Sequence, residues 1–288
     1  MQSISTAQQP MVVLLHSSAS SARQWDRLAE TLAPRFRVRA IDLHGHGEQA
    51  AWSGNRPLTL ADEAALAASL LEENGGVHLV GHSYGAAVAL KLATIYPESV
   101  RSVAAYEPVL FRWLIDDVAH QQRAQEVIAV ATSMRDELAG DREASAARRF
   151  IDFWSGAGAW NSMPAGKQSS IATCMRAVLQ QFDALFYEPL QPAQLALLSM
   201  PMLFIGGTHT VNVTRRIVEV LRMTLPRAQH TLLQAMGHMG PVTHASEVNR
   251  TLLEFLEAQS APGLQRADRP WSPPPRIERS QRCGDYGL

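Results

Sequence analysis

The sequence predicts an α/β fold with a mostly parallel central sheet, helices on both faces of the sheet and an inserted helical cap. Three features support this prediction. Short apolar runs typical of strands alternate with helix-forming stretches. The alternation stops between residues 111 and 198, where the patterns are helical. Where one strand-like run meets a helical run, the chain reads Gly-x-Ser-x-Gly, which is typical of a sharp strand-to-helix turn.

The expected strands are short apolar runs, which cover residues 11–16, 37–43, 77–82, 100–106, 201–206 and 229–235. The expected helices of the same domain cover residues 21–33, 59–74, 85–96, 212–225 and 245–258. In the last of these, apolar residues recur at helical spacing and share one side, namely Val248, Leu252, Phe255 and Leu256. Reactive groups in such a fold lie beyond the carboxyl ends of the strands.

Residues 111–198 are expected to form the helical cap, and residues 1–110 and 199–260 the α/β core. Stretches 122–138 and 167–186 have amphipathic patterns, and an aromatic, glycine-rich stretch at 150–160 lies between them. We expect most of these aromatic side chains to pack between cap helices, with one or two facing a pocket.

Residues 261–288 differ in composition from the rest of the chain. Four prolines are interspersed with arginines, a composition that cannot build a core; the prolines are Pro270, Pro273, Pro274 and Pro275. We expect a disordered tail, and a basic docking peptide is the alternative.

Composition excludes several function classes. The chain has 288 residues, of which 46% are hydrophobic and 18% charged, as in an ordinary globular protein. A net charge of −1 gives no reason to expect nucleic acid or a membrane surface as a partner. Two cysteines, no signal-like start and no long apolar run favour a soluble, cytoplasmic protein. The expected partner is a small molecule, and the oligomeric state is not predictable.

Ser83 is the expected nucleophile, because it is central in the Gly-x-Ser-x-Gly motif. Gly81 and Gly85 lack side chains, so the strand before the serine and the helix after it can approach closely. Such a serine needs a base to remove its proton. His238 follows the last strand-like run and is the expected base, whereas His244 lies near the next helix and is expected to cap it or to face solvent.

Attack on a carbonyl creates an oxyanion that needs preorganised donors. We expect these donors to be the backbone N–H groups of Tyr84, after the nucleophile, and Ser18, in the loop after the first strand. No histidine pair has metal-ligand spacing with a carboxylate, and no glycine-rich loop has the form that binds phosphate. The sequence therefore predicts neither a metal nor a cofactor.

Taken together, these motifs resemble the α/β-hydrolase fold superfamily. His16-Ser17-Ser18 stands where many members have His-Gly-x, and residues 42–47 match the Asp-x-x-Gly-x-Gly loop of the family. With residues 81–85 and Gly237-His238, the motifs occur in the family's order over roughly residues 10 to 260. The resemblance implies a capped hydrolase with a serine nucleophile, and it is not specific for substrate.

Two departures from the family pattern matter. Ser17 replaces the usual glycine of the oxyanion loop, and Thr210 stands where members usually carry the aspartate of the triad. Loss of that acid in a serine protease lowers turnover by about 10⁴. The resemblance implies Glu107 as a substitute, because some members place their acid at the end of this strand. The alternatives are that Glu107 caps a cap helix or pairs with Arg112, or that Asp42 supplies the acid; Asp42 is the weaker candidate and is expected to anchor its own loop.

Two hypotheses follow. The first is a serine hydrolase that acts on a small ester, thioester, lactone or related carbonyl substrate through a Ser-His dyad or a Ser-Glu-His triad. The second is a degenerate member that binds a small ligand with little or no hydrolysis, which Ser17 and Thr210 would explain. The intact Ser83 and His238 favour the first hypothesis.

Overall fold

A parallel sheet of six strands forms the centre of the molecule, as predicted. The computed structural model describes residues 9–116 and 121–260. The strands lie in the order β2-β1-β3-β4-β5-β6, and every neighbouring pair is parallel. Their bounds agree with the predicted runs to within two residues: β1 Met11–Leu15, β2 Arg37–Ile41, β3 Val77–His82, β4 Val100–Tyr106, β5 Met202–Gly207 and β6 Gln229–Leu233.

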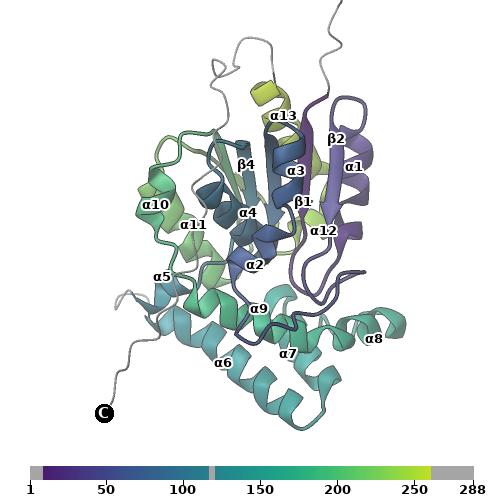
Figure 1. Ribbon diagram of the computed structural model, residues 1–288. Helices are drawn as coiled ribbons and strands as arrows, with labels where there is room; N and C mark the ends of the chain where they lie inside the picture. The colour runs from purple at the N-terminus through teal and green to yellow at the C-terminus, as the bar shows by residue number, and fades with distance from the viewer. Residues whose placement is uncertain (1–8, 117–120, 261–288) are drawn as a thin grey trace, which may run out of the picture.

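Helices cover both faces of this sheet (Figure 1). Alternate strand residues point to opposite faces, so Val12 and Leu14 join one buried cluster while Val13 and Leu15 join the other. The first cluster includes residues of α1 (Asp26–Leu32) and α13 (Ala245–Ser260). The second includes residues of α2 (Leu60–Ala65), α3 (Ala68–Glu73), α4 (Tyr84–Ile95) and α11 (Asn212–Thr224).

Three predicted helices are divided. Residues 21–33 form the 3-10 turn η1 (Ala22–Trp25) followed by α1, and residues 59–74 form α2 and α3. Between α2 and α3, the N–H groups of Leu66 and Ala67 bond to carbonyls three residues back, which tightens the chain into a turn. Residues 167–186 divide at Cys174, whose N–H bonds in the same way to Ile171.

The segment between β4 and β5 is helical, and we keep the name helical cap for residues 111–198. Figure 1 shows α6, α7, α8 and α9 together beyond one end of the sheet. The cap helices are α5 Arg112–Ile115, α6 Gln121–Ala139, α7 Glu143–Ser155, α8 Ala165–Thr173, α9 Met175–Tyr187 and α10 Pro192–Ala196. Division into core and cap at these boundaries stays a prediction, and the expected tail lies outside the described residues. Within the described part, no helix is both long and apolar enough to cross a membrane.

Candidate active site

Ser83 occupies the sharp turn between β3 and α4. Its backbone has φ 54° and ψ −114°, a conformation that side-chain-bearing residues rarely adopt. A Cβ at Gly81 would lie 2.5 Å from the Ala86 Cα, and one at Gly85 would lie 2.3 Å from the Leu15 carbonyl oxygen. Glycine is therefore required at both positions for the turn to pack this closely, as the motif predicts.

Glu107 lies where β4 ends, also with a positive φ, of 43°. Its side chain is fully buried, and its two oxygens accept hydrogen bonds from different elements. Oε1 accepts from the backbone N–H of Gly207 at 2.8 Å, and Oε2 accepts from the Thr210 hydroxyl at 2.6 Å. Arg112, the alternative partner weighed from the sequence, instead pairs with Asp116.

His238 lies in the loop after β6 and connects the two preceding residues. Its Nε2 is 2.8 Å from the Ser83 Oγ, and its Nδ1 is 2.7 Å from Oε2 of Glu107. All three side chains are at least 95% buried, since Ser83 is 5%, His238 3% and Glu107 0% exposed. Because a carboxylate can only accept, the Nδ1–H of His238 donates to Glu107, and Nε2 is left to accept the proton of Ser83.

Thr210, at the family's usual acid position, is part of this arrangement. Its single hydroxyl proton is donated to Glu107, and its oxygen lies 2.8 Å from the Thr214 hydroxyl, which also donates to the Val211 carbonyl at 3.1 Å. Glu107 thus accepts bonds from Gly207, Thr210 and His238. Thr210 therefore has no carboxylate of its own but donates a hydrogen bond to the carboxylate of Glu107.

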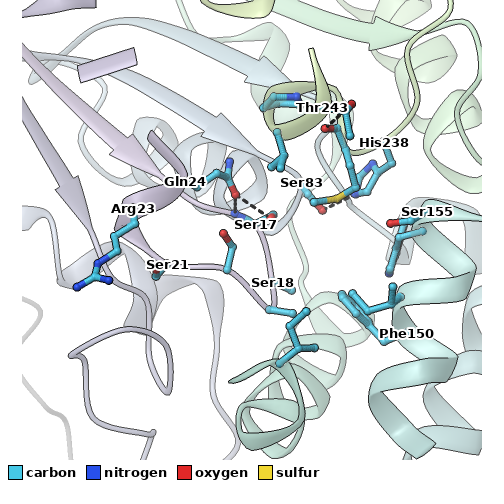
Figure 2. Close-up of a pocket in the computed structure, with 18 of the residues that line it drawn as sticks. Ser17, Ser18, Ser21, Arg23, Gln24, Ser83, Phe150, Ser155, His238 and Thr243 are labelled. Carbon is cyan, nitrogen blue, oxygen red and sulfur yellow. Dashed lines mark hydrogen bonds between the residues drawn. The ribbon is translucent and has the colours of Figure 1, made fainter. Parts of the chain in front are cut away.

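Gln24 and His82, which no pattern in the sequence marks, connect the loop after β1 to the turn at Ser83. The Gln24 Oε1 accepts from both the N–H (3.1 Å) and the hydroxyl (2.9 Å) of Ser17, as Figure 2 shows. The Gln24 Nε2 donates to Nδ1 of His82 at 3.1 Å, and the His82 Nε2 donates to the His238 carbonyl at 2.8 Å. Ser17 therefore anchors the loop, and its N–H is not free for an oxyanion.

Of the predicted oxyanion donors, Ser18 lies in the loop after β1, and Tyr84 directly follows Ser83 at the start of α4. Ser18 lines the same cavity as Ser83 and His238, and within the described residues its N–H has no hydrogen-bond partner. The N–H of Tyr84 is in the first turn of α4, where no intrahelical acceptor is available. The phenol of Tyr84 donates to Oε1 of buried Glu63 at 3.2 Å.

Asp42 and His16 bind nearby backbone groups, and His244 lies apart from Ser83 and His238. Asp42 accepts from the N–H groups of Ala22 and Glu48, so it anchors its own loop. His16 donates from Nδ1 to the Ser17 carbonyl and accepts at Nε2 from Leu43, and burial lowers its pKa to about 3. His244 contacts the exposed hydroxyl of Thr243 and lies outside the site.

A cavity of about 670 Å³ opens in front of Ser83 and His238. Figure 2 shows Ser17, Ser18 and Gln24 on one side of it and Phe150 of the cap on another. Its apolar wall comes mainly from the cap, through Phe111, Phe150, Ile151, Trp154, Ile171, Phe182 and Leu185. Within the aromatic stretch 150–160, Phe150 and Trp154 face the cavity, in line with the one or two expected. No group of three metal-ligating side chains occurs among the described residues.

Comparison with known proteins places this site in a family context. The sequence profile of the Alpha/beta hydrolase family matches residues 12–251. An acetyltransferase component of an acetoin cleaving system from Cupriavidus necator is 36% identical over 102 residues, which is 35% of this chain and 27% of that protein. The chain thus spans only about a quarter of that relative.

A second relative matches over most of both chains. The pimeloyl-[acyl-carrier protein] methyl ester esterase of Nitrosomonas europaea is 27% identical over 251 residues, covering 81% of this chain and 90% of the relative. Among solved structures, the enol-lactonase of Burkholderia xenovorans superposes with a TM-score of 0.69 at 20% identity, covering 87% of this chain and 92% of that one. At this identity the structural likeness shows the fold alone.

Proposed function

Because the chain belongs to the Alpha/beta hydrolase family, we propose that it is a serine hydrolase acting on a small ester, thioester, lactone or related carbonyl substrate. One observation carries the proposal: Ser83, His238 and Glu107 form a continuous series of hydrogen bonds at 2.8 and 2.7 Å. Along the chain, the three residues occur in the order nucleophile, acid, base, which is the order typical of this fold.

In the proposed mechanism, the Ser83 Oγ attacks the carbonyl carbon while Nε2 of His238 takes its proton. Glu107 holds the imidazole by Nδ1 and balances the positive charge that develops on it. The N–H groups of Tyr84 and Ser18 receive the oxyanion. His238 then protonates the leaving group, and an activated water molecule releases the acyl group from Ser83.

The cap wall supports a substrate with an apolar part. A cavity of about 670 Å³ is in the usual range for small-molecule sites. The carbonyl would lie at Ser83, and the apolar part would contact side chains such as Phe150 and Phe182. The relative from Nitrosomonas europaea is a methyl ester esterase, which supports an ester among the carbonyl classes.

The reason to consider a binding protein without hydrolysis was the presence of Ser17 and Thr210 in place of the family's usual residues. In the structure, Ser17 bonds to Gln24 and Thr210 bonds to Glu107. Each residue supports a neighbouring site residue instead of leaving a gap, so neither departure now favours that alternative.

Labelling with a fluorophosphonate, read by intact mass, tests the proposal. The wild type is expected to gain one adduct, and Ser83→Ala is expected to gain none while keeping its fold. A folded wild type that takes up no probe and cleaves no short-chain ester would refute the proposal and return the degenerate binding protein as the better hypothesis.

A further inference from the structure

The indole of Trp154 stacks on the imidazole of His238. The ring centroids are 4.3 Å apart and the planes meet at 30°. Trp154 belongs to α7 of the helical cap, whereas His238 lies in the loop after β6. Both are buried, with exposed fractions of 6% and 3%. A cap residue therefore covers one face of the expected base directly.

The other surroundings of His238 decide how its charge is balanced. Glu107 accepts from Nδ1, and Ser83 contacts Nε2. His82 also lies close to His238, with ring centroids 5.2 Å apart and planes at 50°. Burial lowers the pKa of His82 well below its ordinary value, so this neighbour is uncharged near neutral pH. Tyr106, whose phenol donates to the Gly237 carbonyl, also contributes no charge.

Packing, and not hydrogen bonding, holds the indole in place. Phe111 stacks near it at 6.4 Å and 17°, and Phe153 meets it edge-on at 4.8 Å. The Nε1–H of Trp154 is buried and has no acceptor among the described residues. That atom is covered, so it cannot reach a substrate in the cavity, and the residue's contribution lies in its ring face.

We propose that Trp154 is a positioning residue for the reaction: its π face stabilises the imidazolium that forms on His238 when Ser83 loses its proton. The negative face of an indole attracts a cation, and the attraction is strongest where water is excluded. The effect corresponds to about twofold in an equilibrium or a rate at an exposed site and to about thirtyfold at a desolvated one. The inference rests on the proposed function, since only a base that becomes protonated benefits.

The proposal also links the cap to the chemistry. The α/β core supplies Ser83, Glu107 and His238, but the cap supplies the aromatic face. In this proposal, the groups that stabilise the charged form of His238 are all present only while α7 lies over it.

The test compares Trp154→Phe, Trp154→Leu and Phe182→Leu in the full chain. Phe keeps an aromatic face and Leu keeps only apolar cover, and neither loses a hydrogen bond. Phe182 lines the same cavity, and its ring contacts among the described residues do not include Trp154 or His238, so it controls for changes in the wall. The readouts are kcat and KM across pH on a short-chain ester.

We expect kcat to fall in the order Trp, Phe, Leu, by between about twofold and thirtyfold for Leu, with the acidic limb of kcat/KM moving to lower pH. Phe182→Leu is expected to change KM while the acidic limb stays in place. If Trp154→Leu behaves like Phe182→Leu, the indole is only a wall of the cavity and the proposal is wrong.

A readout without turnover separates this inference from the proposed function. The imidazole Cε1–H resonance of His238 is assigned in the full chain by its loss in His238→Asn. In Trp154→Leu it is expected to lose its ring-current shift and to titrate at lower pH, by roughly 0.4 to 1.5 pH units. A midpoint that stays or rises overturns the inference even if the enzyme is active. An inactive wild type with the expected shift would refute the proposed function alone.

Discussion

The hydroxyl of Thr210 donates a hydrogen bond of 2.6 Å to Oε2 of Glu107, the same oxygen that accepts from His238. The position at which the family usually has its acid and the proposed acid Glu107 are thus direct neighbours. The bond keeps Glu107 oriented, as the proposed role of orienting His238 requires.

Replacing the acid is expected to be severe. Glu107→Gln keeps the size of the side chain but removes the charge that balances the imidazolium, and its amide can present a donor to His238. Turnover should fall by roughly 10³ to 10⁴ with the fold retained. Steady-state kinetics, with circular dichroism as the check on folding, would measure this. Activity within about tenfold of wild type would show that the protein operates as a Ser-His dyad, since loss of a working acid costs far more.

Introducing the family's usual acid is expected to harm the protein. Thr210→Asp would place a second carboxylate against Glu107, and two such groups cannot both ionise easily. We expect lower turnover near neutral pH that recovers partly toward lower pH, because one carboxyl then stays protonated. Thr210→Val, which only deletes the hydroxyl, is the matched control and should cost less. Higher activity in Thr210→Asp would mean that Glu107 is a poor substitute for the missing acid.

Gln24 is expected to matter although it does not contact the reacting atoms. Its amide joins Ser17 to His82, and His82 in turn holds the His238 carbonyl. Gln24→Leu should lower kcat by about tenfold or more while KM changes little. The reason is that the change loosens both the loop that carries the Ser18 N–H and the loop that carries His238. The rate of fluorophosphonate labelling should fall in parallel.

The control for Gln24 is a change at the preceding residue of the same turn. Arg23 is exposed and also lies at the cavity, but it belongs to no hydrogen bond of the series from Ser17 to His238. Arg23→Gln is therefore expected to keep kcat and the labelling rate close to those of the wild type. An equal loss in both variants would contradict a specific role for Gln24.

Stability should depend on pH through Glu63. This side chain is fully buried, and burial raises its pKa to about 7, from an ordinary 4.5. The folded state therefore holds the proton more tightly than the unfolded state. The resulting stabilisation is complete below pH 4.5 and is lost as the pH rises to about 7, by up to about 3 kcal/mol.

Glu63→Gln is expected to abolish that dependence. The amide keeps the acceptor for the Tyr84 phenol and cannot ionise. Urea unfolding at about pH 5 and about pH 7, on either side of the expected loss, would compare the two proteins. Equal slopes of stability against pH in both would assign the dependence to other groups.

The sequence was sufficient for the sheet, and it singled out two residues that lie within hydrogen-bond distance of each other in the structure. Strand-like runs bounded by turn residues located all six strands. The inner strands β1 and β5 are buried along their whole length and apolar throughout, whereas the edge strands β2 and β6 are only partly buried and carry polar residues. Ser83 and His238 stood out because their motifs constrain the local backbone. Glu107 stayed open, since its partner is 131 residues away and no local pattern shows that two side chains meet.

What the sequence did not reveal depends on tertiary contacts. Gln24 and His82 bond across 58 positions, and a glutamine on a surface-like stretch carries no signal of such a role. The break at Cys174 was missed because amphipathic periodicity continues through it from α8 to α9. The stacking of Trp154 on His238 likewise requires the cap to be folded over the core.

The backbone of Ser83 has a consequence for anyone who engineers this protein for heat resistance. A serine at φ 54° and ψ −114° stores conformational energy that a glycine would not. Ser83→Gly would relieve that energy, on the order of 1 kcal/mol, and would give up only one side-chain hydrogen bond. Selection for melting temperature alone would thus reward loss of the proposed nucleophile, so screens on this scaffold need turnover as a second criterion.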